Sequence, residues 1–191
     1  PRPPRWQTEW RQSHVAAPQT PPSPAGPALV LDAPRDRLQA ATGPADFEAW
    51  TDGACVPNPG PGGFGAVIVD CKSGAQTEIQ GAIRQTTNNR AELEAVIAAL
   101  RSLPRGARVE VVTDSRYVME PVRTGAIEKV RRLGWKRKNS ELINSDLWRL
   151  LYAEVEARAV SWRWVRGHTG VALNERADRL AERAAARARF L

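Results

Sequence analysis

Four acidic residues of this chain each lie in a short and distinctive sequence context. They are Asp52 within Thr-Asp-Gly, Glu92 within Asn-Asn-Arg-Ala-Glu-Leu, Asp114 within Thr-Asp-Ser, and Asp178 shortly after the Gly-His pair that contains His168. Grouped carboxylates provide the hard oxygen ligands that Mg²⁺ and Mn²⁺ prefer. The chain itself is basic, with 28 Lys and Arg against 21 Asp and Glu and a net charge of +7. A basic protein that still gathers acids indicates a metal-dependent enzyme acting on nucleic acid.

The overall charge and the few cysteines exclude several other classes of protein. A pI near 10.2 predicts attraction to polyanions, with nucleic acid as the leading candidate. No apolar run approaches the roughly 20 residues of a transmembrane helix, so no membrane partner is expected. Two cysteines, Cys55 and Cys71, and two histidines, His14 and His168, are too few for a disulfide framework or a zinc site. Any metal is therefore expected to bind through oxygen.

Composition divides the chain near residue 45. Residues 1–45 hold ten of the 15 prolines, so this segment is expected to be a flexible arm that packs no core. No signal peptide is visible in it, and a cytoplasmic location is expected. The arm carries a charge of +2, which leaves 7 − 2 = +5 for the folded domain at 46–191. Trp6 and Trp10 lie among arginines and could dock a protein partner or stack on bases; an unstructured linker is the alternative.

From residue 46 onwards the hydrophobic pattern alternates between strand and helix periods. The predicted strands are 47–54, 64–70, 77–84, 109–113 and 160–165. One helix is predicted from the apolar face formed by Leu93, Val96, Ile97 and Leu100, and it ends before Pro104. Further helices are predicted from Ser115 with interruptions at Pro121 and Gly125, from 126 to about 133, over 146–157, and from about 174 to 189. The order β-β-β-α-β-α-α-β-α predicts an α/β fold in which helices cover the faces of a mixed sheet. The middle region, up to residue 138, is expected to protrude.

Each acid has a possible local explanation that needs no chemistry. Asp52 is the hardest to explain, because Asp is unfavourable within a strand. Glu92 would lie at the N3 position of a helix capped by Asn89, where a capping-box glutamate is common. Asp114 precedes a helix and could cap it, and Asp178 in the first turns of the last helix would meet its macrodipole favourably. These separate explanations leave the distinctive neighbours of the four acids unexplained.

Longer segments around the four acids closely resemble type-1 ribonuclease H of the bacterial kind. The resemblance runs from about residue 46 to the C-terminus, and several motifs at consistent separations make a chance match improbable. The segments are TDGACVPNPGPGGFG at 51–65, TTNNRAEL at 86–93, TDSRYV at 113–118, GWK at 134–136, DLW at 146–148, and GHTG through NERAD at 167–178.

The resemblance implies a ribonuclease H-like fold, with a five-stranded mixed sheet built from a three-stranded antiparallel meander plus parallel strands. It also implies a monomeric endonuclease that hydrolyses the RNA strand of RNA/DNA hybrids and leaves 5′-phosphate and 3′-hydroxyl ends. The four acids would hold two Mg²⁺ ions about 3.5 to 4 Å apart, with Mn²⁺ as a possible substitute. His168, between glycines, would carry a proton or assist product release; the alternative is an exposed loop histidine.

The same resemblance assigns residues to binding of the hybrid. Small polar groups suit the wide minor groove where 2′-hydroxyls lie, and a basic, aromatic protrusion suits the phosphate backbone. A departure is that the helix before the protrusion contains Pro121 and Gly125 and lacks tryptophans. The expected substrate-binding residues are Cys55, Asn58, Thr87, Asn88, Asn89, Arg116, Arg131, Arg132, Trp135, Lys136, Lys138 and Asn144.

Two other functions remain open on the sequence alone. The chain could be another nuclease of the same fold, such as an integrase or resolvase, although those families lack the Asn-Asn-Arg and Gly-His motifs together. It could also be a catalytically silent hybrid-binding module, although all four acids are present. Outside the site, Trp148, Trp162 and Trp164 are expected in the core, because their spacing places them on packed faces.

Overall fold

The computed structural model describes residues 43–137 and 140–191. The expectations for the N-terminal arm, including docking through Trp6 and Trp10, lie outside the described residues, as does the expected role of Lys138. Within those two ranges, no helix is both long enough and apolar enough to cross a membrane.

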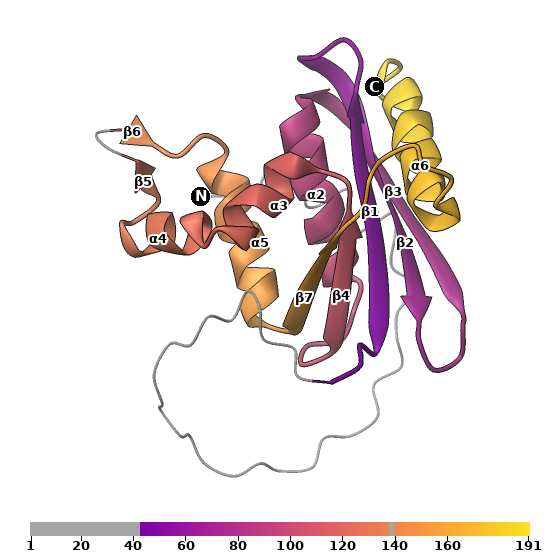
Figure 1. Ribbon diagram of the computed structural model, residues 1–191. Coiled ribbons are helices and arrows are strands. Elements are labelled where there is room, and N and C mark those ends of the chain that lie inside the picture. The colour runs from indigo at the N-terminus through magenta and orange to yellow at the C-terminus, as the bar shows by residue number, and fades with distance from the viewer. Residues whose placement is uncertain (1–42, 138–139) are drawn as a thin grey trace. The chain divides into compact units, whose positions relative to one another are not determined.

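A mixed five-stranded sheet in the order β3-β2-β1-β4-β7 forms the centre of the fold (Figure 1). Strands β1 (Phe47–Cys55), β2 (Gly60–Asp70) and β3 (Gln76–Thr86) form an antiparallel meander. Strands β4 (Arg108–Thr113) and β7 (Ala159–Trp164) continue the sheet, and both run parallel to β1. The predicted meander with added parallel strands is confirmed.

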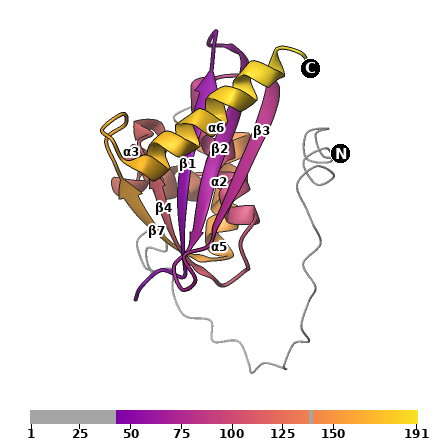
Figure 2. The same cartoon turned by 90° about the vertical axis from the view of Figure 1, so that its right-hand side faces the viewer.

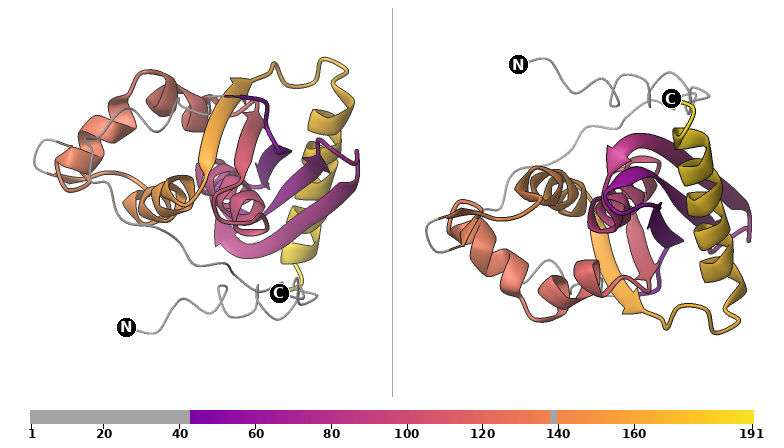
Figure 3. Two further views of the ribbon diagram at one scale, coloured as in Figure 1. Left: turned by 90° about the horizontal axis from the view of Figure 1, so that it is seen from below. Right: turned by 90° about the horizontal axis from the view of Figure 1, so that it is seen from above.

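Helices cover both faces of this sheet. Helix α6 (Ala172–Ala188) lies across the antiparallel strands on one face (Figure 2). Helices α2 (Asn88–Arg101) and α5 (Ser145–Glu156) lie side by side on the opposite face (Figure 3). The α2 face carries Leu93 and Ile97, which are both almost completely buried. The three helices end within two residues of the predicted limits, because their apolar faces follow the helical period closely.

Strand β2 begins at Gly60, four residues before the predicted start, so the glycine-rich segment is strand and not loop. The reason is the close approach of α6. A Cβ atom added at Gly63 would lie 2.5 Å from the Ala184 Cβ, and one at Gly65 would lie 2.3 Å from the Ala177 carbonyl oxygen. Glycine is therefore required here so that a helix can pack directly on the strand, a tertiary demand that turn propensity does not reveal.

The predicted interruption at Pro121 is wrong, because Pro121 lies inside helix α3 (Arg116–Arg123). Proline removes only one backbone hydrogen bond, and the buried side chains of Val118 and Val122 hold this short helix in place. The break falls at Gly125 instead, where φ is +67° and helix α4 (Ala126–Arg132) begins.

The region after α4 protrudes from the sheet, as predicted (Figure 1). It contains a small antiparallel pair, β5 (Lys136–Arg137) and β6 (Ser140–Glu141), that the sequence pattern did not predict. Trp135, the residue before β5, fixes this pair to helix α5. It is only 8% exposed, and its ring packs edge-on against Tyr152, with 6.0 Å between the ring centroids.

Of the three tryptophans expected in the core, Trp148 is buried and Trp162 is half-buried. The expectation for Trp164 is wrong, since its side chain is 44% exposed. Trp164 is the last residue of β7, and its indole Nε1 donates to the Asp114 carbonyl oxygen at 3.0 Å. It contacts the end of the neighbouring strand where the predicted site begins.

Candidate functional site

Asp52 and Asp114 follow the last paired positions of two parallel strands. β1 and β4 pair in register up to Thr51 opposite Thr113; Asp52 is the next residue of β1, and Asp114 follows directly after the end of β4. Because the two strands run in the same direction, both carboxylates reach the same end of the sheet. The carboxyl ends of parallel strands are where α/β proteins commonly bind ligands.

Glu92 reaches the same place from helix α2. The helix is capped by Thr87, whose Oγ1 accepts a hydrogen bond from the Arg90 backbone N–H at 3.3 Å. The alternative explanation of Glu92 as a capping-box residue behind an Asn89 cap is therefore wrong. With the cap at Thr87, Glu92 is the fifth residue of the helix, beyond the position from which a glutamate reaches back to the cap.

One carboxylate oxygen from each of Asp52, Glu92 and Asp114 lies within 4.8 Å of the other two. Burial, reinforced by the charges of Asp114 and Asp178, raises the pKa of Asp52 to about 8. Burial and the nearby Asp52 likewise raise the pKa of Glu92 well above its ordinary value. Within the described part of the chain, the buried Glu92 Oε2 has no hydrogen-bond partner. An all-oxygen donor set with an unsatisfied buried oxygen suits a hard divalent cation.

Asp178 lies beside this triad but outside it. Its α6 position brings it close enough to Asp52 to raise the pKa of that group, as noted above. Its Oδ2 lies 3.6 Å from His168 Nδ1, and its side chain is 23% exposed. Three of the four predicted metal ligands therefore converge, and the fourth lines the exposed side of the cluster next to the predicted histidine.

Three contacts from the β7–α6 segment hold Asp114 in place. Asn174 is 2% exposed, and its Nδ2 donates to Asp114 Oδ2 at 3.0 Å. Gly167 lies so close that a Cβ there would come within 2.4 Å of the same oxygen, and a larger residue would require the Asp114 side chain to shift. Trp164 supplies the third contact through the Asp114 carbonyl. Sequence reasoning did not assign these residues to the site, although all three lie in or next to the Gly-His and Asn-Glu-Arg motifs.

His168 lies in the exposed loop between β7 and α6. Its backbone has a φ of +54°, in the left-handed region, and its side chain is 83% exposed. Apart from the Asp178 carboxylate, no partner holds the ring within the described residues. The side chain is therefore positioned at the edge of the cluster with freedom to turn towards it.

Predicted hybrid-binding residues gather where the β1–β2 loop meets the start of α2. Asn58 Oδ1 accepts a hydrogen bond from the Asn88 backbone N–H at 3.2 Å, and Asn88 and Asn89 are exposed on the first turn. Cys55 differs, because it is only 2% exposed and its thiol contacts the carbonyl oxygens of residues 57, 60 and 86 at 3.2 to 3.4 Å. Its side chain supports the loop, and contact with substrate stays a prediction.

Asn144 connects the helices around this surface. Its Nδ2 donates to the Tyr117 hydroxyl at 2.9 Å, and its Oδ1 accepts from the Arg90 guanidinium at 3.3 Å. Arg90 in turn forms a bidentate ion pair with Asp146, with distances of 3.0 and 2.7 Å. Arg116, exposed at the start of α3, lies 5.9 Å above the Trp164 ring. These contacts connect α2, α3 and α5 below the surface that is predicted to bind the hybrid.

The predicted basic residues of the protrusion are not equally available. Arg131 and Arg132 both pair with Glu128, at 2.9 and 3.1 Å, and Arg131 also stacks 4.5 Å from the Tyr152 ring centroid. Trp135 is buried and offers no open face for a base. Lys136 is exposed. Contact with phosphates is therefore expected mainly from lysine, with the two arginines also serving to hold the protrusion together.

Replacing Asp52 with Asn should stabilise the metal-free protein at about pH 8 by roughly 1–3 kcal/mol. The folded-state pKa of about 8 lies above the ordinary 3.8. Between these values the native state binds more protons than the unfolded state, so stability falls as pH rises, and asparagine abolishes this loss. Urea unfolding with a chelator at about pH 5 and pH 8 measures the effect. A parent protein whose stability stays flat or rises over that interval would contradict the prediction.

The strand order of the mixed sheet, with a carboxylate cluster beside its parallel strands, is the arrangement expected of a metal-dependent nuclease with a ribonuclease H-like fold. A family model, described as RNase H, matches residues 44–186. The chain belongs to the RNase H family.

Individual relatives agree with this assignment. Ribonuclease H of Hahella chejuensis is 47% identical over 135 residues, which cover 70% of this chain and 89% of that protein. The crystal structure of LC9-RNase H1, a type 1 RNase H with the type 2 active-site motif, is 34% identical with a TM-score of 0.67, covering 77% of this chain and 75% of the other. LC11-RNase H1, solved in complex with an RNA/DNA hybrid, is 29% identical with a TM-score of 0.55, covering 74% and 98%.

Proposed function

We propose that this protein is an endonuclease that hydrolyses the RNA strand of RNA/DNA hybrids and leaves 5′-phosphate and 3′-hydroxyl ends. The observation that carries the proposal is the convergence of Asp52, Glu92 and Asp114 within 4.8 Å in a chain of the RNase H family. Mg²⁺ is the proposed cofactor, with Mn²⁺ as a substitute. When bound, such ions supply a nucleophilic hydroxide and neutralise charge on the phosphate.

In this proposal the protein supplies the ligands and the orientation. Asp52, Glu92 and Asp114 hold the cation, and Asp178 completes the set from α6. Because burial raises the pKa of Asp52 and Glu92, cation binding must displace protons from this cluster at neutral pH. Asn174 holds the Asp114 carboxylate through its hydrogen bond, and Gly167 leaves room for that carboxylate.

Substrate recognition is proposed for the surface formed by the β1–β2 loop, the start of α2 and the protrusion. Asn58, Thr87, Asn88 and Asn89 offer small polar groups suited to 2′-hydroxyls and a backbone phosphate. The basic residues of the protrusion would add affinity that weakens with salt. We also propose that the protein acts as a monomer in the cytoplasm and that a protein partner binds through residues 1–45.

A three-substrate cleavage assay tests the proposed activity. Labelled RNA/DNA hybrid, duplex DNA and duplex RNA are each incubated with Mg²⁺, Mn²⁺ or a chelator. We expect cleavage of the RNA strand of the hybrid alone, only with a metal, and products with 5′-phosphate ends. Cleavage of all three duplexes, or of none with either metal, would exclude the proposal. The protein should still bind the hybrid in the presence of chelator, because contacts between basic residues and phosphates do not depend on metal.

Replacing His168 with Ala should slow turnover about a hundredfold, the lower end of the range for loss of a proton-transferring group. The side chain is exposed and contacts Asp178 only loosely, at 3.6 Å, so the fold and the carboxylate triad should be unaffected. Cleavage rates measured across the pH range report the loss of proton transfer, and calorimetry with the metal shows whether the triad still binds it. A variant that matches the parent at every pH would remove His168 from the mechanism.

A further inference from the structure

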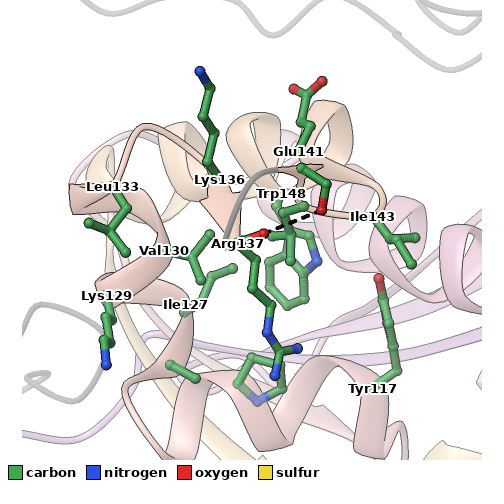
Figure 4. Close-up of a pocket in the computed structure, with 14 residues that line it drawn as sticks. Tyr117, Ile127, Lys129, Val130, Leu133, Lys136, Arg137, Glu141, Ile143 and Trp148 are labelled. Carbon is green, nitrogen blue, oxygen red and sulfur yellow. Dashed lines mark hydrogen bonds between the residues drawn. The ribbon is translucent and has the colours of Figure 1, made fainter.

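An open hollow of about 850 Å³ lies between α3, α4 and the β5–β6 hairpin (Figure 4). Its lining is mainly aliphatic: Ile127, Val130 and Leu133 lie on one side and Ile143 lies on the other. Leu133 and Ile143 are 58% and 78% exposed, which is unusual for side chains of this size. The volume lies within the roughly 300–1,000 Å³ typical of binding pockets. The proposed nuclease activity leaves this apolar surface unexplained.

Three cations surround the hollow: Lys129 and Lys136 stand at its edge, and Arg137 extends across its front (Figure 4). Among the described residues, none of them has a carboxylate within 4.0 Å. The acid at the edge, Glu141, already accepts from Ser145 at 2.6 Å and pairs with Arg149 at 3.4 Å. The rim is therefore positively charged and the floor is apolar.

We propose that this hollow docks an acidic peptide segment of a partner protein, with an aliphatic side chain of the peptide inserted between Leu133 and Ile143. Opposite charge selects the acidic flanks, and burial of the two exposed side chains supplies the remaining affinity. The interaction is additional to hybrid cleavage, and it neither uses nor requires the carboxylate triad.

Two other occupants fit the chemistry less well. Hybrid phosphates can contact Lys136, as proposed above, but a sugar–phosphate backbone would leave the apolar floor uncovered. A stacked base would need a free aromatic face, but Trp148 is 3% exposed and packs against Tyr117, with 6.0 Å between their ring centroids. A second copy of this chain carries a net charge of +7, and Trp6 and Trp10 of its own arm lie among Arg2, Arg5 and Arg11. Both would meet the rim with charge of the same sign.

Fluorescence anisotropy with two labelled peptides tests the proposal on the full chain. The first peptide is Asp-Leu-Glu-Asp-Leu-Glu, and the second has both leucines replaced by serine. We expect saturable binding of the leucine peptide at both low and physiological salt, at least about tenfold tighter than the serine peptide. Equal affinity for the two peptides would show a purely electrostatic contact and overturn the proposal, as would the absence of saturable binding.

Surface variants locate the binding. Leu133→Ser and Ile143→Ser should each weaken the leucine peptide about fivefold or more, and Arg137→Glu about tenfold. Phe190→Ser, which removes a 90% exposed side chain elsewhere, is the matched control and should change affinity less than twofold. Thermal melts confirm that each variant is folded. An equal loss in Phe190→Ser would overturn the proposal, and so would Ile143→Ser weakening a single-stranded oligonucleotide but not the peptide.

Discussion

Replacing Asp114 with Asn is expected to reduce cleavage of the hybrid at least about a thousandfold while leaving hybrid binding within about twofold. Loss of a metal-binding carboxylate removes several kcal/mol of transition-state stabilisation, and each 1.4 kcal/mol is about tenfold in rate. The amide is nearly isosteric, and its oxygen can still accept from Asn174 Nδ2, which now lies 3.0 Å from Asp114 Oδ2. The fold and the basic groove should therefore persist.

Glu110→Gln is the matched control for this experiment. Glu110 lies on the same strand, but its carboxylate pairs with Arg163 at 2.9 Å and takes no part in the triad. Single-turnover cleavage should be unchanged in this variant, and gel-shift titration with chelator should give the same affinity for the parent and both variants. An Asp114→Asn protein that retained more than about one hundredth of the parent rate would contradict the assignment of Asp114 as a metal ligand.

Replacing Gly53 with Ala is expected to cost about 3 kcal/mol of folding free energy and about a hundredfold in cleavage. A Cβ at this position would lie 2.3 Å from the Glu92 backbone nitrogen and 2.4 Å from the Ala91 carbonyl carbon. Both contacts are with backbone, so β1 and α2 must move apart. That movement separates Asp52 from Glu92, and a misplacement of about 1 Å can cost about a hundredfold in rate.

Gly81→Ala separates the loss of stability from the loss of geometry. Gly81 lies in the same row of the sheet, where Gly53 faces Phe64 and Phe64 faces Gly81. Its added Cβ would meet the buried Phe64 ring at 2.4 Å, away from the carboxylates. Both variants should lose stability in urea unfolding. Under conditions where both remain folded, only Gly53→Ala should lose cleavage. An equal loss in both variants would mean that the loss does not come from the separation of Asp52 and Glu92, and no loss in either would mean that the site tolerates the shift.

Local patterns predicted most of the secondary structure because each element carries its own period. Strand β4 and helix α2 end where Thr113 and the run before Pro104 indicate, since alternation and helical spacing are properties of neighbouring residues. The failures occur where packing overrides propensity. The segment from Gly60 to Gly63 looks like a turn but forms strand under α6, and Pro121 looks like a break but lies within α3.

The site divides along the same line. Motif context identified all four acids and His168, yet it gave Glu92 a false alternative, because Asn89 looked like the helix cap and Thr87 is the actual one. The spacing of Trp164 from Trp162 along the strand also predicted that Trp164 lies in the core. In the structure it lies at the strand end and holds the Asp114 carbonyl, a contact that requires β4 and β7 to be neighbours.

By itself, the sequence determined the order of the helices and of the five strands of the main sheet, the family, and which acidic residues stand in the family's motifs. Only the tertiary structure decided that Asp52, Glu92 and Asp114 share one space while Asp178 lies at its edge. It also decided that Arg131 and Arg132 are paired and that an apolar hollow with a basic rim opens beneath the protrusion. The physical reason is that residue types and hydrophobic spacing are properties of neighbouring residues in the sequence. Burial, ion pairing and the effect of one carboxylate on the pKa of another depend on which distant segments become neighbours in space.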